Sequence, residues 1–417
     1  MPRILLVAAT TGYQTRAFAD AARALGFDVV LATDRCHVLE DPWRDQAIPV
    51  RFEDPAGARD VLAASGPFDA IVPVGDRPTL IAAMAAEALG LAHSPPAAVA
   101  ACRDKYLARQ LYKAAGLPVP EFFRVSLAEY SGAIARSAMF PCVLKPLGLS
   151  ASRGVIRAND PAEFAAAFER IKVILEGTDV LILREEQNRF IQVESYIEGR
   201  EFALEGLLTD GKLQVLAIFD KPDPLDGPFF EETIYVTPSR AAAEVQRALI
   251  QTSLAAAGAL GLTNGPLHAE LRYNPRGAWV LEVAARSIGG LCARALRFEG
   301  GRTMEELLLC HAVGEDVSHA RLAGGASGVM MIPIPKGGIY QGTAGIEQAS
   351  AVADIDEVII TAKEGQKILP LPEGASYLGF IFARAGTPER VEQALREAHH
   401  CLEFDIATVL PVMPSLK

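Results

Sequence analysis

Short apolar runs alternate with amphipathic segments at the start of the chain. The runs 4–9, 28–32 and 70–74 have the length of buried strands, and the segment 14–25 carries apolar residues at helical spacing. Strands that alternate with helices are typical of a parallel, doubly wound sheet. We therefore expect an N-terminal α/β domain over residues 1–96.

Apolar periodicity also predicts the organisation of the C-terminal quarter. Strands are expected near 329–334, 357–361 and 378–384. The helix predicted from Pro388 to Cys401 has one core-facing side, formed by Val391, Ala394, Leu395, Ala398 and Leu402. We expect two lobes over 97–190 and 191–315, followed by an α+β domain over 316–417.

Two apolar segments that each contain a glutamate predict a β-hairpin. Residues 265–272 and 278–283 have the pattern of antiparallel strands joined by the polar turn 273–277. This hairpin would place Glu270 and Glu282 side by side. Mg²⁺ takes oxygen ligands, usually one or two carboxylates together with substrate phosphates. The pair is a candidate metal site, although charged residues that alternate along a strand more often form only its solvent-facing side.

Phosphate-binding groups precede this hairpin. Lys145 ends a buried-strand pattern, and the small-residue loop 147–155 follows it. The lysine offers a compact cation, and the loop offers main-chain NH groups and the hydroxyls of Ser150 and Ser152. Lys105, which opens a predicted helix, is a second candidate. Either lysine alone would more often be a surface residue, but their order in the chain supports a phosphate site.

The segment 193–201 has the features of an adenine and ribose site. In a strand that runs into a turn, Glu194 can accept a hydrogen bond from an adenine amino group, and the main-chain NH of Ile197 can donate to a ring nitrogen. Glu201 would then lie within reach of both ribose hydroxyls.

These motifs, together with residues 281–290, resemble the ATP-grasp superfamily, and within it the carboxylate–amine ligases of the L-amino acid ligase type. The resemblance covers nearly the whole chain and is specific for the superfamily, less so for the substrate. It implies an α/β and α+β fold: an N-terminal doubly wound parallel α/β domain, a two-lobed ATP clamp and a C-terminal α+β lid domain. It implies ATP and Mg²⁺ as cofactors, with Mn²⁺ as an alternative ion, and Glu270 and Glu282 as metal ligands. The residues that it implies in nucleotide binding are Lys105, Lys145, Ser150, Ser152, Arg153, Gly154, Glu194, Tyr196, Ile197, Glu201 and His268.

The resemblance also implies a reaction. The γ-phosphoryl group of ATP moves to a substrate carboxylate, and an amine attacks the resulting acyl phosphate to form an amide, ADP and phosphate. Lys145 and Arg286 would stabilise the transferred group. In the long loop 219–239, Glu232 would attract the ammonium group of the amine and help to remove a proton from it, with Tyr235 three residues away. A solvated loop without substrate contact is the alternative.

One position departs from the family pattern, and two arginines each have two possible roles. Ala284 stands where many relatives carry an asparagine that binds metal, so one ligand must come from water or elsewhere. Arg153, inside the serine loop, either contacts phosphate or is solvated. Arg286 either faces the acyl phosphate or forms a structural ion pair.

Composition excludes several classes of protein. The chain has 417 residues, of which 50% are hydrophobic and 22% charged, so it is globular rather than disordered. Its net charge is −11 and it has no basic run, which argues against nucleic-acid or anionic-membrane partners. The six cysteines lack C-x-x-C spacing and are typical of reduced thiols in a cytoplasmic protein. No apolar run approaches the roughly 20 residues of a membrane helix.

The expected substrates are an amino acid, or a similar small carboxylate, and an amine that together give a dipeptide or amide. Two alternatives remain: a purine-biosynthesis-type or carboxylating member of the superfamily, and a nucleotide-binding protein without ligase activity. Since many relatives are dimers, a homodimer is expected.

Overall fold

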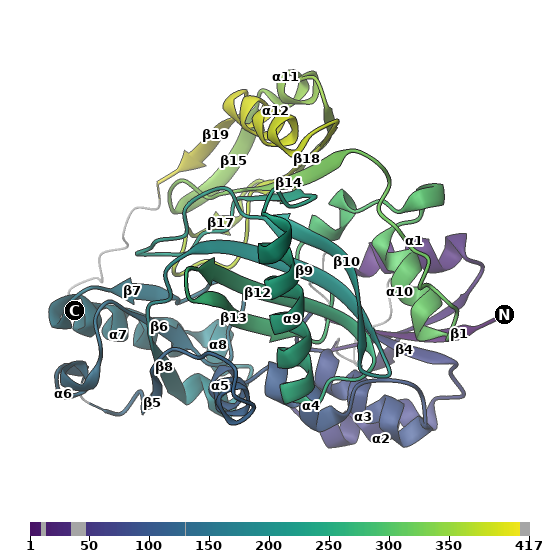
Figure 1. The fold of residues 1–417 in the computed structure, drawn as a ribbon, viewed down its shortest axis with the longest axis horizontal. Helices are drawn as coiled ribbons and strands as arrows, with labels where there is room; N and C mark the ends of the chain where they lie inside the picture. Colours follow the sequence, from purple (N-terminus) through teal and green to yellow (C-terminus); the bar gives the residue numbers. More distant parts are fainter. Residues whose placement is uncertain (10–13, 35–46, 130, 409–417) are drawn as a thin grey trace, which may run out of the picture.

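The computed structural model describes residues 1–9, 14–34, 47–129 and 131–408 (Figure 1). The chain begins with a parallel sheet in the order β3-β2-β1-β4. The strands are β1 (Arg3–Ala8), β2 (Asp28–Thr33), β3 (Ile48–Pro49) and β4 (Ala70–Val74), and the helices are α1 (Thr15–Ala24), α2 (Pro55–Ala64) and α3 (Thr79–Leu89). The strands and the helix predicted here are confirmed.

β1 shows why these strands are continuous apolar runs. Ile4 and Leu6 pack into one hydrophobic core, while Leu5 and Val7 pack into another on the opposite side of the sheet. Both faces of a parallel sheet are covered, so neither set of alternating side chains meets water.

The next segment contains an antiparallel sheet in the order β5-β8-β6-β7. Its strands are β5 (Phe122–Ser126), β6 (Cys142–Pro146), β7 (Ile156–Ala158) and β8 (Phe190–Ser195). The helices of this segment are α4 (Pro96–Cys102), α5 (Lys105–Ala114), α6 (Ser131–Ile134), α7 (Pro161–Leu175) and α8 (Thr178–Leu181), of which α4 packs against α3 and α9 instead of this sheet. The start of α5 is fixed by Asp104, whose carboxylate accepts from the NH groups of Tyr106 and Leu107. This cap determines where Lys105 lies.

An eight-stranded sheet in the order β13-β12-β9-β10-β11-β14-β18-β16 forms the centre of the molecule, with α9 (Ala243–Leu260) across it (Figure 1). The strands are β9 (Arg200–Thr209), β10 (Lys212–Asp220), β11 (Ile234–Thr237), β12 (Gly265–Asn274), β13 (Gly277–Ala284), β14 (Ala326–Ile332), β16 (Ile355–Ile360) and β18 (Gly379–Ala385). The predicted hairpin is confirmed as β12 and β13. Because β11 pairs with β14, the sheet continues into the C-terminal segment.

The remaining elements complete the C-terminal part. A small sheet has the order β17-β15-β19, with β15 (Gly338–Ala344), β17 (Lys367–Ile368) and β19 (Glu403–Ala407), and the helices are α11 (Ile346–Ser350) and α12 (Pro388–His400). The helix α10 (Met304–Ala312) precedes this part and packs beside α1 (Figure 1). The predicted strands and the core-facing side of α12 are confirmed, since Val391, Ala394, Leu395 and Ala398 are fully buried. The segments 1–96, 97–190, 191–315 and 316–417 remain our proposal for the domains, although one sheet crosses the last boundary.

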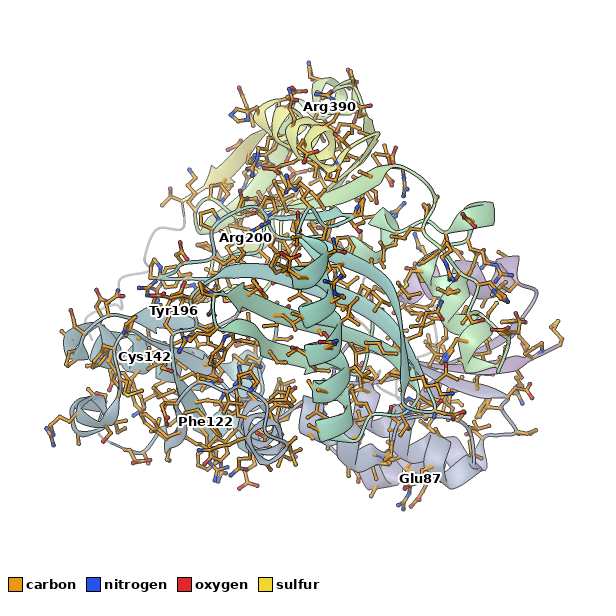
Figure 2. The ribbon with its side chains drawn as sticks, viewed as in Figure 1. Glu87, Phe122, Cys142, Tyr196, Arg200 and Arg390 are labelled. Carbon is orange, nitrogen blue, oxygen red and sulfur yellow. The ribbon has the colours of Figure 1, made fainter. Side chains whose placement is uncertain are left out.

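The predicted α/β and α+β fold class is confirmed, because a parallel sheet flanked by helices precedes the antiparallel sheets. Among the described residues, none of the helices has both the length and the hydropathy needed to cross a membrane. Phe122 and Cys142 mark the first lobe in Figure 2, Arg200 the central sheet and Arg390 the C-terminal part.

Candidate active site

A cleft lies between the first lobe and the central sheet. The loop after β6, the end of β8 and the facing strands β9, β12 and β13 line it. The structure brings together in this cleft most of the predicted site residues, namely Lys105, Lys145, Ser150, Ser152, Glu194, Tyr196, Ile197, Glu201, Glu232, Glu270, Glu282 and Arg286.

Glu270 and Glu282 are direct cross-strand partners in the β12–β13 hairpin, and both line the cleft. Opposite residues of an antiparallel pair project to the same face of the sheet. A carboxylate oxygen of Glu282 lies 3.7 Å from Nζ of Lys105. Burial raises the pKa of Glu270, but Lys221 and His268 lower it below its usual value, so this carboxylate is ionised. Two adjacent anionic oxygen donors that face a cleft fit the ligand preference of Mg²⁺.

Glu194 is 2% exposed, and its carboxylate is occupied by neighbouring side chains. Nζ of Lys145 lies 2.6 Å from one oxygen, and Nε of Arg109 donates to the other at 2.6 Å. Gln192 also donates to Glu194. Burial raises the pKa of Glu194, but Arg109 and Lys145 lower it to about 2. In this structure Glu194 therefore holds Lys145 in the cleft, in addition to lining the expected adenine site.

Arg109 was missed by the sequence analysis. It lies four residues after Lys105 in α5, which places both side chains on one face of the helix. Its guanidinium is also fixed by the main-chain oxygens of Val280 and Leu281, at 2.9 and 3.0 Å. The spacing of the two cations was the available signal.

Ile197 offers its main chain to the cleft. No hydrogen-bond acceptor for its NH is found among the described residues. Its carbonyl oxygen accepts from Arg272 at 2.7 Å, which fixes the orientation of this peptide segment. An adenine ring nitrogen could be the missing acceptor.

The serine loop is held from two sides. Nζ of Lys105 donates to the carbonyl oxygen of Leu149 at 2.7 Å, and the NH of Gly154 donates to that of Pro372 at 2.9 Å. Arg153 points away from the cleft, because its guanidinium pairs with Asp179 at 2.6 Å and donates to the carbonyl oxygen of Glu373. The structure thus does not bring Arg153 and Gly154 to the cleft wall, whereas Ser150 and Ser152 line it.

A cluster of carboxylates surrounds one buried lysine. Ligand atoms of Glu201, Glu232 and Glu270 lie within 4.8 Å of one another, a spacing that could hold a metal ion. Nζ of Lys221 lies 2.8 Å from Glu201, 3.8 Å from Glu270 and in hydrogen-bond contact with Glu232. Arg272 also pairs with Glu201, at 2.9 Å. These cations balance the cluster, so Glu270 with Glu282 remains the better candidate for a metal.

Lys221 was not identified from the sequence, because it falls in the segment 219–239, which the pattern predicts as a long loop. Its side chain is 2% exposed. Lys221 also affects the pKa of Glu232. Burial and the Glu270 carboxylate raise that pKa and Lys221 lowers it, and the result is a pKa of about 7.

Tyr196 and His268, both predicted to bind nucleotide, hydrogen-bond neighbouring acidic side chains. The hydroxyl of Tyr196 donates to Asp226 at 2.9 Å, and the guanidinium of Arg157 lies 4.1 Å from its ring centre. His268 does not line the nucleotide cleft but hydrogen-bonds Glu205 and lies 3.4 Å from Glu270. Burial lowers the pKa of His268, but Glu205 and Glu270 raise it to about 9.

A second pocket adjoins the cleft, and Glu232, Glu270 and Arg286 line both spaces. Its other walls combine polar groups with apolar and aromatic side chains, which are Gln14, Asp76, His268, Tyr235, Cys292, Met331 and Tyr377. Tyr235, expected in the substrate loop, is 2% exposed and belongs to this wall. A ligand in the second pocket would meet a ligand in the cleft at Arg286.

Three family models match the chain in order. They are an ATP-grasp N-terminal domain at residues 19–93, an ATP-grasp domain at 138–295 and the L-amino acid ligase C-terminal domain 2 at 330–407.

The curated relatives align with this chain over only part of their own length. The ATP-grasp enzyme fsqD of Aspergillus fumigatus is 29% identical over 65% of this chain and 53% of its own. The D-alanine–D-alanine ligase B of Chromobacterium violaceum is 28% identical over 45% of this chain and 59% of its own. The matched regions therefore span a little over half of these relatives.

The solved structures that match over almost their whole length include an L-amino acid ligase. The L-amino acid ligase from Bacillus licheniformis superposes with a TM-score of 0.83 and 26% identity, covering 98% of this chain and 99% of that protein.

Proposed function

Because this chain belongs to the ATP-grasp family, we propose that it is a carbon–nitrogen ligase that joins an amino acid, or a similar small carboxylate, to an amine at the expense of ATP. The observation that carries this proposal is the meeting of two pockets at Arg286 and Glu232. One pocket fits a nucleotide and the other fits small polar molecules with an apolar part. A dipeptide or amide is the product.

The cleft supplies contacts for each part of ATP. The NH of Ile197, which has no acceptor among the described residues, suits an adenine ring nitrogen, and Glu201, which lines the same cleft, suits the ribose. Lys105, Lys145 and the hydroxyls of the serine loop suit the phosphates. Glu194 supports this arrangement by holding Lys145.

Glu270 and Glu282 would hold Mg²⁺, which shields the charge of the phosphates when bound. Mn²⁺ is the alternative ion, since it accepts the same oxygen ligands. Ala284 contributes no ligand, so these two carboxylates are the protein's share of the site.

The cations of the cleft permit the approach of a carboxylate to ATP. Two unit negative charges 4 Å apart repel each other by about 4 kcal/mol at an effective dielectric constant near 20. Lys145, Lys221 and Arg286 are positioned to offset this repulsion and to stabilise the charge that spreads over the transferred phosphoryl group.

Glu232 suits the amine step. With a pKa of about 7 it is partly ionised at neutral pH, so it can attract an ammonium group and accept its proton. The deprotonated amine then attacks the acyl carbon, and phosphate leaves.

Two comparisons favour the amino-acid reaction over a purine-type or carboxylating one. The C-terminal domain model comes from L-amino acid ligases, and an L-amino acid ligase superposes with a TM-score of 0.83, against 0.68 and 0.69 for a phosphoribosylglycinamide synthetase and an N5-carboxyaminoimidazole ribonucleotide synthetase that cover a similar share of the chain. A nucleotide-binding protein without ligase activity would bind ATP but release no phosphate with any substrate pair.

The test is a phosphate-release screen over pairs of amino acids with Mg²⁺ and ATP, followed by mass spectrometry of the product. ADP and phosphate should form only when both substrates are present. Glu282→Gln should abolish phosphate release and leave the circular dichroism spectrum unchanged, while Glu364→Gln, an exposed residue in the C-terminal part, should behave as wild type. Phosphate release with a single substrate, or full turnover by Glu282→Gln, would contradict the proposal.

A further inference from the structure

Asp76, in the N-terminal domain, makes a two-point ion pair with Arg286. Nε of Arg286 lies 2.6 Å from one carboxylate oxygen and Nη2 lies 3.1 Å from the other. The two residues are 210 positions apart in the chain. Burial raises the pKa of Asp76, but Arg286 lowers it below its usual value, so the pair is ionic.

The position of Asp76 is fixed by its own domain. It follows β4 at the carboxyl end of the parallel sheet, and α3 begins three residues later at Thr79. Both the NH and the hydroxyl of Thr79 donate to the carbonyl oxygen of Asp76, at 3.2 and 2.6 Å. The carboxylate therefore projects from a short, doubly anchored turn.

The hydrogen bonds of Arg286 leave one edge of its guanidinium available. A guanidinium has five N–H donors in a rigid plane. Two of them bond to Asp76, and a third, on Nη1, donates to the carbonyl oxygen of Ser287 at 2.8 Å. One N–H on each terminal nitrogen has no partner among the described residues. Since Arg286 lines both pockets, these donors are available where the pockets meet.

We propose that Asp76 is a positioning residue for the ligase reaction: it aims the two free donors of Arg286 at the oxygens that carry charge during phosphoryl transfer. This inference rests on the proposed function. A carboxylate that only neutralised Arg286 would weaken the attraction for anions, and its removal would then increase activity. A positioning carboxylate has the opposite effect, because a misplaced donor no longer meets the transferred group.

The experiment compares Asp76→Asn with wild type in the amino-acid-dependent release of phosphate. We expect kcat to fall on the order of 10- to 100-fold, the loss typical of a catalytic group displaced by about 1 Å. The KM for ATP and the affinity for MgADP should stay near wild-type values, since Asp76 does not line the nucleotide cleft. Asp76→Glu, which retains the charge, should recover part of kcat.

A double-mutant cycle shows whether Asp76 acts through Arg286. In an Arg286→Lys background, Asp76→Asn should reduce kcat by a much smaller factor than it does in wild type, because the planar two-point pair no longer exists. Asp354→Asn, which breaks the 2.6 Å pair with Arg390 in the C-terminal part, is the control for loss of an ion pair and should leave kcat unchanged.

The outcomes separate the two proposals. No turnover by wild type with any substrate pair overturns the proposed function. Turnover by wild type together with unchanged or higher kcat in a folded Asp76→Asn, or equal effects of that change in both backgrounds, overturns the positioning role alone.

Discussion

Glu194 and Glu232 are glutamates of the same cleft, yet their pKa values differ by several units. Burial raises the pKa of both. Arg109 and Lys145 then lower that of Glu194 to about 2, whereas the Glu270 carboxylate adds to the burial of Glu232 and leaves its pKa at about 7. One glutamate is therefore a permanent anion that positions a lysine, and the other is suited to exchange a proton.

The pKa of Glu232 predicts a pH dependence for amide formation. Only the ionised carboxylate accepts a proton, so kcat/KM for the amine should rise with pH through about 7 and then level off. Glu232→Gln should lower kcat/KM for the amine and remove its rise near pH 7. The measurement is amide formation from pH 5.5 to 8.5 at saturating ATP, with hydroxylamine as a control nucleophile that needs little help from a base at neutral pH. An unchanged pH profile in Glu232→Gln would exclude this role.

At the scale of elements, the serine loop depends on the C-terminal part of the chain. Gly154 donates to the carbonyl oxygen of Pro372, and Arg153 and Arg170 both contact Glu373, the second through bonds of 2.5 and 2.9 Å. Tyr377, four residues later, lines the second pocket. One segment thus contacts both the loop over the cleft and the pocket beside it.

Gly154→Ala tests how closely this loop is constrained. Gly154 has a φ of +72°, and an added Cβ would lie 2.7 Å from Cγ of Pro146. Gly116 has a similar φ of +77°, but an added Cβ there would meet no atom within 4 Å. Both substitutions carry the left-handed penalty of about 1–2 kcal/mol. Gly154→Ala should lower the free energy of unfolding by about 1–3 kcal/mol more than Gly116→Ala does, because of the clash with Pro146.

The free energy of unfolding in urea, measured for wild type and both variants, checks this difference. Gly154→Ala should also raise the KM for ATP, since Ser150 and Ser152 belong to the same loop, while Gly116→Ala should not. Equal losses of unfolding free energy in the two variants would show that the loop can move to accommodate the added Cβ at residue 154.

At the scale of the whole molecule, one hydrophobic core joins the N-terminal sheet, the central sheet and the C-terminal part. It contains Ile4 of the N-terminal sheet, Phe219 of the central sheet, Leu307 of α10 and Phe380 of β18. Arg286 adds an ion pair between the central sheet and the N-terminal domain. Ligands that bind between these parts should therefore stabilise the whole fold.

Nucleotide binding should raise the unfolding temperature in a metal-dependent way. At a ligand concentration 100 times the Kd, the free energy of unfolding rises by about 2.7 kcal/mol. Thermal unfolding with MgADP should show this gain, and EDTA should remove most of it. Glu282→Gln should lose the metal-dependent part, whereas Glu364→Gln should retain it. A gain that is unchanged by EDTA would argue against a metal held by Glu270 and Glu282.

The sequence by itself determined the local features of this protein: the apolar strands, the helix start at Asp104, the hairpin that pairs Glu270 with Glu282, and the order of the lysines and the serine loop. Each of these depends on neighbouring residues or on a short turn, so periodicity and capping reveal them. Only the tertiary structure decided which charges meet. Arg109 reaches Glu194 across 85 positions and Asp76 reaches Arg286 across 210, because segments that are distant in the chain pack against one another and give these buried charges their partners.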